Sequence, residues 1–205
     1  MTQRGTLYTI SAPSGAGKTS LVAALLEKTP NLQVSISHTT RPRRPGETDG
    51  VNYHFVSKEQ FQTMLGQQAF LEHADVFDNH YGTSAQWVDD TLAGGCDVIL
   101  EIDWQGAAQI HRQLPDTVSI FVLPPSKGTL LERLTQRGQD GPEVIAQRIA
   151  EAQAEMSHFA AADYLIINDV FATALEELAL IISSGKLLLK KQQCQHQTLI
   201  KELLL

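Results

Sequence analysis

Near its N-terminus the chain reads Tyr8-Thr9-Ile10-Ser11-Ala12-Pro13-Ser14-Gly15-Ala16-Gly17-Lys18-Thr19. The apolar and β-branched residues from Leu7 to Ile10 predict a short buried strand. Two glycines then mark a tight loop, and the apolar residues after Thr19 recur with the period of a helix. A strand, a glycine-rich loop and a helix in this order are typical of a P-loop, which binds phosphate groups.

Each part of this segment has a physical role in binding phosphate. Glycines let consecutive backbone N–H groups turn inward without a side-chain clash, and the start of the helix adds a partial positive charge. Lys18 would bring a full positive charge to the β- and γ-phosphates, and Thr19 would offer a hydroxyl group to Mg²⁺. The first position of the general pattern is Ala12 instead of glycine. An ordinary strand-to-helix turn is the alternative, which Gly17 directly before Lys18 and Thr19 disfavours.

The composition restricts the class of protein. The chain has 205 residues, enough for one sizeable core with small insertions. Its net charge of −7 favours a soluble protein, and we expect neither nucleic acid nor a membrane surface as a partner. The N-terminus shows no apolar secretion signal, and no run of residues approaches the ~18 apolar residues that span a bilayer. Since the two cysteines, Cys96 and Cys194, lie far apart, we expect free thiols and a cytoplasmic protein.

Strands and helices are predicted to alternate over most of the chain. Mainly apolar runs predict strands, and helical periods with capping residues predict the helices between them. The predicted strands after the first are 97–103, 118–123 and 164–167, and the predicted helices include 104–114, 126–137 and 143–159. This alternation indicates an α/β fold with a mostly parallel sheet covered on both faces.

Residues from about 35 to 90 do not alternate in this way and predict an insertion of mixed structure. Strands are predicted at 33–37, 53–56 and 70–77, with a helix at 57–66 that starts with a capping box of Ser57 and Gln60. Two prolines and a glycine exclude a regular element from 38 to 46.

The predicted strand at 97–103 ends with acidic residues. P-loop proteins commonly place a carboxylate at the end of a strand beside the P-loop, where it holds Mg²⁺ directly or through water. Residues two apart in a strand share a face, so Glu101 and Asp103 are expected to point the same way. The alternative is a strand-end carboxylate that faces solvent, which the P-loop upstream disfavours.

Three arginines in four positions, Arg41, Arg43 and Arg44, stand out in this acidic chain. Guanidinium groups bind phosphate with two parallel hydrogen bonds, so this cluster predicts an anion site. The alternative is a solvated basic loop.

A second arginine set lies on two predicted helices around a glycine-containing loop and consists of Arg133, Arg137 and Arg148. A hinged pair of helices that carries arginines is suited to closing over a triphosphate and neutralising its charge. The alternative is that these arginines form surface ion pairs with Glu132, Glu143 or Glu151.

The C-terminus is rich in aliphatic residues with helical spacing, namely Leu187 to Leu189, Leu199, Ile200 and Leu203. We expect these residues to pack in the core. A contact between subunits, which would make the protein a homo-oligomer through its C-terminal helix, is the alternative.

These segments together resemble guanylate kinases of the bacterial type over nearly the whole chain. The resemblance rests on the P-loop, Ser37-His38-Thr39-Thr40-Arg41-Pro42-Arg43-Arg44-Pro45-Gly46-Glu47, Tyr53-His54-Phe55, Phe70-Leu71-Glu72-His73-Ala74, Tyr81-Gly82-Thr83, Ile102-Asp103-Trp104-Gln105-Gly106 and Arg137-Gly138. It implies a P-loop kinase with a five-stranded parallel core sheet, an inserted mixed α/β region that binds GMP and a helical lid. The implied division is a core of 1–34, 91–125 and 159–205, a GMP-binding insertion of 35–90 and a lid of 126–158. Ala12 is normal at its position in this family.

The resemblance also implies which residues form the site. The ATP side would consist of Ala12, Pro13, Ser14, Gly15, Ala16, Gly17, Lys18, Thr19, Arg133, Arg137 and Asn168. The GMP side would consist of Ser37, Arg41, Arg44, Tyr53, Glu72, Tyr81, Thr83 and Asp103. Mg²⁺ would be held by Thr19 and, through water, by Glu101 or Asp103, and catalysis would depend on Lys18, Arg41, Arg137 and Arg148.

The residue types on the GMP side agree with the chemistry of guanine. A carboxylate such as Glu72 can accept hydrogen bonds from N1–H and N2–H₂ together, and a hydroxyl group of Ser37 or Thr83 can donate to O6. Adenine would leave such groups unpaired, so a site of this kind rejects adenine strongly. One departure from the family is Glu101 in place of the usual Asp, from which we expect a small effect on activity.

The implied activity is transfer of the γ-phosphoryl group of ATP to GMP, giving ADP and GDP, in purine nucleotide metabolism and GMP recycling. ATP and GMP would be the partners, with Mg²⁺ as the cofactor. One alternative is a sugar-phosphate kinase on the same scaffold, which Ser37, Glu72 and Thr83 disfavour. Another is a guanylate-kinase-like module that binds phosphopeptides without catalysis, which the intact P-loop and the lid arginines disfavour.

Overall fold

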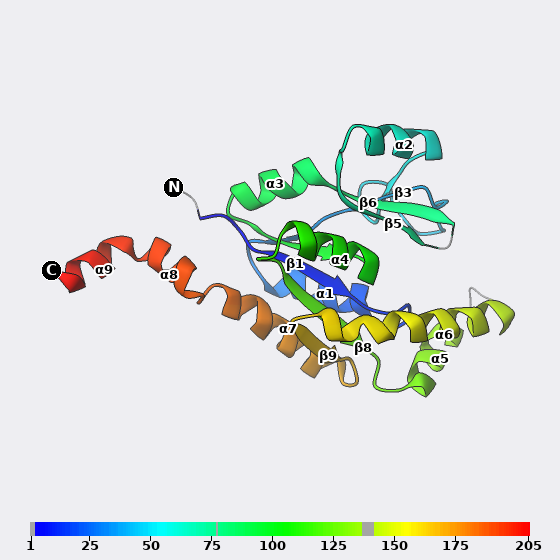
Figure 1. Ribbon diagram of the computed structural model, residues 1–205. Coiled ribbons are helices and arrows are strands. Elements are labelled where there is room, and N and C mark those ends of the chain that lie inside the picture. Colours follow the sequence, from blue (N-terminus) through cyan, green and yellow to red (C-terminus); the bar gives the residue numbers. More distant parts are fainter. Residues whose placement is uncertain (1–2, 77, 137–141) are drawn as a thin grey trace.

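A five-stranded parallel sheet forms the centre of the computed structural model, which describes residues 3–76, 78–136 and 142–205. The strand order is β2-β7-β1-β8-β9 (Figure 1). The strands are β1 (Leu7–Ser11), β2 (Leu32–Val34), β7 (Asp97–Glu101), β8 (Val118–Leu123) and β9 (Tyr164–Ile167). The predicted α/β fold with a parallel core sheet of five strands is confirmed.

Helices cover both faces of this sheet. They are α1 (Lys18–Lys28), α3 (Ala85–Ala93), α4 (Trp104–Gln113) and α7 (Phe171–Gly185). Tyr8 and Ile10 of β1 belong to a buried cluster with residues of α1 and α7, whereas Leu7 belongs to a cluster with residues of α3 and α4. Because successive strand residues point to opposite faces, the nearly continuous apolar runs of these strands fill both clusters.

The inserted region contains a second sheet of mixed direction, with the order β4-β3-β6-β5 (Figure 1). Its elements are β3 (His38–Thr39), β4 (His54–Phe55), α2 (Lys58–Gly66), β5 (Phe70–Val76) and β6 (Asn79–Ser84). The predicted capping box is present, since Ser57 accepts from the backbone of Gln60 and the Gln60 side chain accepts from the backbone of Ser57.

The strands in and beside this region differ from the predicted ones in three places. The strand predicted at 33–37 ends at Val34, the last residue that pairs with β7. The sequence predicts no regular element from 38 to 46, yet β3 forms in the four residues before the first proline and pairs with both β4 and β6. Strand β6 is not predicted, because its polar sequence NHYGTS lacks the apolar alternation of a strand and is stabilised by pairing with β5.

Two helices occupy the region predicted to be the lid. Helix α5 (Lys127–Gln136) packs on α6 (Pro142–Met156) through Leu130, Leu134 and Ala152. A 3₁₀ helix, η1 (Ser157–Ala161), follows α6 and leads to β9. The division of the chain into core, insertion and lid at the boundaries given above stays a prediction.

The C-terminal helices α8 (Leu189–Gln195) and α9 (Gln197–Leu204) extend away from the core sheet (Figure 1). Lys191 anchors α8, because its ammonium lies 3.6 Å from the Asp97 carboxylate and donates to the Thr6 hydroxyl. The expected core packing of this segment is wrong, since the leucines at 187–189, 199 and 203–205 are all more than half exposed. Within the described part of the chain, every helix is too short or too polar to cross a bilayer.

Candidate nucleotide site

The P-loop between β1 and α1 has the backbone geometry that its glycines require. Gly15 and Gly17 have φ angles of 90° and 94°, in the left-handed region that favours glycine. Gly17 caps the start of α1, so the backbone N–H groups of the first helical turn open toward the loop. A Cβ atom at Gly15 would lie 2.9 Å from a methyl group of Leu130, so α5 packs directly against the loop.

Lys18 and Thr19 join the P-loop to the end of β7. The Lys18 ammonium donates to the carbonyl oxygen of Ile102 at 3.1 Å. The Thr19 hydroxyl donates to the Glu101 carboxylate at 2.9 Å. The hydroxyl and carboxylate oxygens that Mg²⁺ prefers are therefore adjacent at the mouth of the phosphate loop.

Asp103, two residues after Glu101, caps the next helix. The chain turns into α4 after Glu101, and one oxygen of Asp103 accepts from the backbone N–H of Gly106 at 2.9 Å, which caps the helix. Its other oxygen accepts from the Gln105 side chain at 3.1 Å. Strand β7 ends at Glu101, so the strand alternation on which we based the shared direction of Glu101 and Asp103 does not extend to Asp103, and that direction stays a prediction.

Asn168 and Arg133 hold the outer side of the P-loop. The Asn168 amide donates to the Ala16 carbonyl at 2.7 Å, and Arg133 donates to the carbonyl oxygens of Ala16 at 3.3 Å and of Asn168 at 3.0 Å. The side-chain oxygen of Asn168 is buried and accepts no hydrogen bond from the residues that the structure describes. A Cβ at Gly17 would lie 2.4 Å from the Asn168 nitrogen, so the loop and Asn168 fit closely.

Two further arginines are predicted to belong to the lid. Arg148 lies on α6 and is partly buried. Arg137 lies outside the described residues.

Arg41 lies among aromatic and acidic side chains of the insertion. Its guanidinium forms an ion pair of 2.6 Å with Glu47 and lies 5.3 Å from the centre of the Tyr53 ring. The Tyr53 and Tyr81 rings are 5.9 Å apart, so three of the predicted phosphate-binding side chains come together. The Arg44 side chain is exposed, and its backbone N–H donates to Glu47 at 2.7 Å.

Glu47, which the sequence reasoning did not assign to the site, holds this loop in place. The hydrogen bond from Arg41 is the main reason that the pKa of the Glu47 carboxyl is below its ordinary value. Burial lowers the pKa of Arg41, but the bond and charge of Glu47 outweigh burial and raise it. A six-residue separation has no helical or strand period, so no pattern in the sequence links the two residues.

Glu72 and Thr83 form a buried pair between β5 and β6. The Thr83 hydroxyl donates to the Glu72 carboxylate at 2.5 Å, and the two residues are 0% and 3% exposed, respectively. Burial raises the pKa of Glu72 to about 7, although the bond from Thr83 acts in the opposite direction. Ser37 precedes β3, whose His38 lies opposite Gly82, so Ser37 and Thr83 lie at the same end of this sheet.

Glu155 of α6 is a further carboxylate beside the P-loop that the sequence reasoning missed. Burial raises its pKa, whereas a hydrogen bond from the Ser14 backbone N–H and the charge of Lys18 lower it. No motif marks this residue, since its position depends on how α6 packs across the core.

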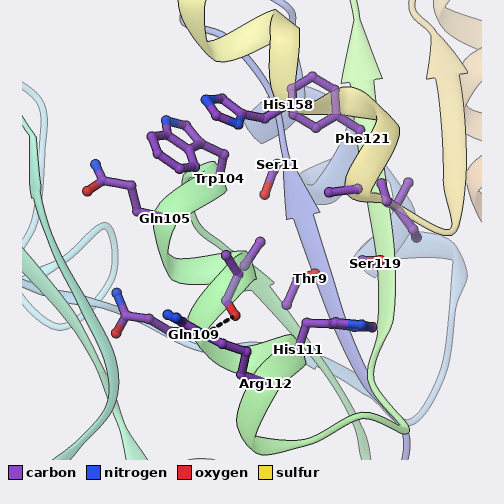
Figure 2. Close-up of a pocket in the computed structure, with 15 residues that line it drawn as sticks. Thr9, Ser11, Trp104, Gln105, Gln109, His111, Arg112, Ser119, Phe121 and His158 are labelled. Carbon is purple, nitrogen blue, oxygen red and sulfur yellow. Dashed lines mark hydrogen bonds between the residues drawn. The ribbon is translucent and has the colours of Figure 1, made fainter.

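A cavity of about 570 Å³ lies next to this region, between α4, η1 and strands β1 and β8 (Figure 2). The Trp104 and His158 rings stack at its upper end, with centres 3.7 Å apart and planes inclined by 5°. Among the described residues, those that line the cavity include Ser11 but neither the P-loop at 12–19 nor the Glu72–Thr83 pair. The cavity is therefore separate from the candidate nucleotide site.

Comparison with known proteins agrees with this arrangement. The sequence profile described as guanylate kinase matches residues 4–185. The chain belongs to the guanylate kinase family. It is 62% identical over 204 residues to the guanylate kinase of Saccharophagus degradans, with 100% of both chains covered. It is 54% identical over 203 residues to the guanylate kinase of Vibrio parahaemolyticus, with 98% of both covered.

The fold of this guanylate kinase family member is also similar to a solved structure. The crystal structure of guanylate kinase from Anaplasma phagocytophilum matches with a TM-score of 0.76 and 32% sequence identity, and the match covers 89% of this chain and 87% of that one. The predicted family is confirmed, and the relatives favour a guanylate kinase over the sugar-phosphate kinase and the phosphopeptide-binding module. The roles of the individual site residues stay predictions.

Proposed function

We propose that this chain transfers the γ-phosphoryl group of ATP to GMP, giving ADP and GDP. The observation that carries the proposal is the buried Glu72–Thr83 pair, which lies in the same chain as a P-loop with Lys18 and Thr19. A buried carboxylate with a hydroxyl partner suits the donor and acceptor groups on the edge of guanine. The family of the chain supports the same activity.

The phosphate loop would hold the ATP triphosphate. Its backbone N–H groups and Lys18 would bind the phosphate oxygens, and Lys18 would leave the Ile102 carbonyl to do so. Thr19 and Glu101 would hold Mg²⁺. Glu101 suits this role better than Asp103, which caps a helix. When bound, Mg²⁺ would neutralise part of the negative charge on the phosphate groups.

Asn168 would contact the adenine of ATP. Its side-chain nitrogen donates to Ala16, and its buried oxygen has no donor within the described part of the chain. An exocyclic amino group such as that of adenine would satisfy this oxygen, because buried acceptors are costly to leave unpaired.

The insertion would bind GMP. Arg41, Arg44, Tyr53 and Tyr81 would hold its 5′-phosphate, and Glu47 would keep the Arg41 guanidinium in position through one of its nitrogens. Glu72 would accept from guanine N1–H and N2–H₂, while Ser37 would donate to O6, as would Thr83 once its single hydroxyl proton turns away from Glu72. Asp103 would lie on the GMP side, in addition to its role as a helix cap.

Catalysis in this proposal depends on position and charge. The acceptor phosphate of GMP is already an anion, so no strong general base is needed. Lys18, Arg41, Arg137 and Arg148 would neutralise charge that develops on the transferred group, and closure of the lid helices would exclude water as a competing acceptor.

An ADP-release assay with GMP, AMP, UMP and CMP as acceptors tests the proposal. We expect GMP to be preferred in kcat/KM by a factor on the order of 10³ or more, because the rejected bases leave buried hydrogen-bonding groups unpaired. Comparable turnover of all four acceptors, or turnover of a sugar phosphate without turnover of GMP, would contradict it.

The exposed leucines of α8 and α9 support association of two copies through the C-terminal helices. Light scattering tests this by comparing the molar mass in solution of the native chain with that of a Leu199→Ser, Leu203→Ser double variant. Equal molar masses for the two proteins would contradict association through these helices. A cytoplasmic location, and the absence of nucleic-acid and membrane partners, stay predictions.

A further inference from the structure

One face of α4 contacts the backbone of β5 on both sides of Glu72. The Gln109 side-chain oxygen accepts from the backbone N–H of His73 at 3.2 Å, and its nitrogen donates to the carbonyl oxygen of the same residue at 2.7 Å. Gln113 donates to the carbonyl oxygen of Leu71 at 3.2 Å. Both neighbours of Glu72 in the chain are therefore held by side chains of α4.

The carboxylate itself packs against the backbone of the same helix at Gly106. A Cβ atom at Gly106 would lie 2.5 Å from one carboxylate oxygen of Glu72 and 3.2 Å from its carboxyl carbon. Gly106 has no left-handed φ angle that would call for glycine. Any larger residue here would force the Glu72 carboxylate or α4 to shift, so glycine at this position lets the side chain of Glu72 lie against the helix.

These three α4 residues lie on one side of the helix. Gly106, Gln109 and Gln113 are separated by three and four positions, the spacing at which helix residues share a face. Figure 2 shows Gln109, which also lines the cavity, reaching from α4 toward the strands of the insertion. One face of one helix thus contacts Glu72 at its carboxylate and at the backbone on each side.

The sheet alone does not set the position of Glu72. The pairing of β5 with β6 shifts register between Phe70 and Glu72, directly before the carboxylate. An irregularity of this kind changes the direction of the side chains next to it. The contacts from α4 lie at this irregularity, where they supply the constraint that regular pairing would otherwise give.

We propose that Gly106, Gln109 and Gln113 are positioning residues that set the selectivity for guanine. They hold Glu72 so that its two oxygens meet the N1–H and N2–H₂ groups together, and they touch neither nucleotide themselves. This inference rests on the proposed function, since it takes GMP as the acceptor. It assigns selectivity to a helix of the core as well as to the insertion.

A comparison of GMP with inosine monophosphate tests this role, because the inosine base lacks only the 2-amino group. In the Gln109→Leu variant we expect the ratio of kcat/KM for GMP to that for inosine monophosphate to fall at least fivefold, with the KM for ATP within twofold of that of the native chain. Gln86→Leu is the matched control, since the Gln86 side chain is exposed and bonds to Asp90 of its own helix. It should leave the ratio unchanged.

Gly106→Ala gives an independent measurement. The added methyl group should reduce kcat/KM for GMP at least tenfold, and by a smaller factor when Glu72→Asp is also present, because the shorter side chain leaves room. Should Gly106→Ala fail to fold, Gln109→Leu decides alone.

The outcomes separate this inference from the proposed function. A native chain that does not phosphorylate GMP contradicts the proposed function. A native chain that does so, together with a folded Gln109→Leu variant whose ratio is unchanged, overturns the role of α4. Equal losses with both acceptors, or a parallel rise in the KM for ATP, overturn it as well, because they indicate general damage instead of a displaced Glu72.

Discussion

Replacing Glu72 by Gln should make the free protein more stable at neutral and alkaline pH. The carboxyl is 3% exposed, and burial raises its pKa to about 7 from an ordinary value of 4.5. The difference between these two pKa values corresponds to about 3 kcal/mol of unfolding free energy. Glutamine has nearly the same shape, can accept the bond from Thr83 and does not ionise.

The sign follows from which state binds the proton more tightly. The folded chain holds the proton of Glu72 up to about pH 7, whereas the unfolded chain releases it near pH 4.5. The contribution of this carboxyl to stability is therefore fully present below pH 4.5 and is lost as the pH rises through about 7. Between pH 5 and pH 8 the native chain should lose about 2–3 kcal/mol relative to Glu72→Gln.

Urea unfolding, followed by circular dichroism at pH 5, 6, 7 and 8, measures this difference directly. Glu177→Gln is the control, because it removes an exposed carboxylate of α7 and should leave the pH profile of the native chain unchanged. Parallel profiles of the native chain and Glu72→Gln would refute the reasoning, since they would mean that Glu72 titrates alike in the folded and unfolded chain.

The same carboxyl should couple GMP binding to pH. If the ionised form accepts from guanine, about a tenth of the sites are ready at pH 6 and about nine tenths at pH 8, so the dissociation constant for GMP should fall roughly tenfold between them. Calorimetry of the Glu72→Gln variant at pH 6 and pH 8 measures how much of the change in the dissociation constant comes from titration of the GMP phosphate alone. An equal change in both proteins would contradict the coupling.

Three further changes test other parts of the structure. Lys18→Ala should lower kcat in the ADP-release assay by a factor on the order of 10² or more with an unchanged melting temperature, because it removes a full charge beside the phosphates; a loss under tenfold would contradict its role. Gly17→Ala should destabilise the chain by about 1–2 kcal/mol, because the φ angle of 94° at this position is unfavourable for alanine. The added Cβ should also displace Asn168 and raise the KM for ATP, so an unchanged KM would contradict this prediction. Lys191→Ala should lower the unfolding free energy by about 1–2 kcal/mol, since it leaves the buried Asp97 without its cation, and a change within error in urea unfolding would contradict this.

The parts of the fold that local chemistry determines could be predicted from the sequence. The P-loop follows from residues adjacent in the chain, because the left-handed backbone at Gly15 and Gly17 depends on glycine wherever the loop lies. The capping box of Ser57 and Gln60 is local in the same way. The site residues of the insertion were assigned through the resemblance to the family.

The features that depend on distant contacts could not be predicted in this way. Strand β6 forms through pairing with β5, and its own residues give no strand signal. Glu101 and Asp103 look equivalent in the sequence, but Glu101 ends β7 and accepts from Thr19, whereas Asp103 caps α4. The aliphatic pattern of α9 indicates an apolar face, yet a pattern alone does not say which surface that face meets.

The stacking of Trp104 on His158 gives the protein an optical reporter of its own motion. Trp104 opens α4 and His158 follows α6, so a movement of α6 relative to α4 must slide or separate these two rings. The fluorescence of an indole is sensitive to a ring stacked this closely on it. The chain has one other tryptophan, Trp87, and a Trp87→Phe variant would leave Trp104 to report nucleotide-driven rearrangement in stopped-flow experiments without an added dye.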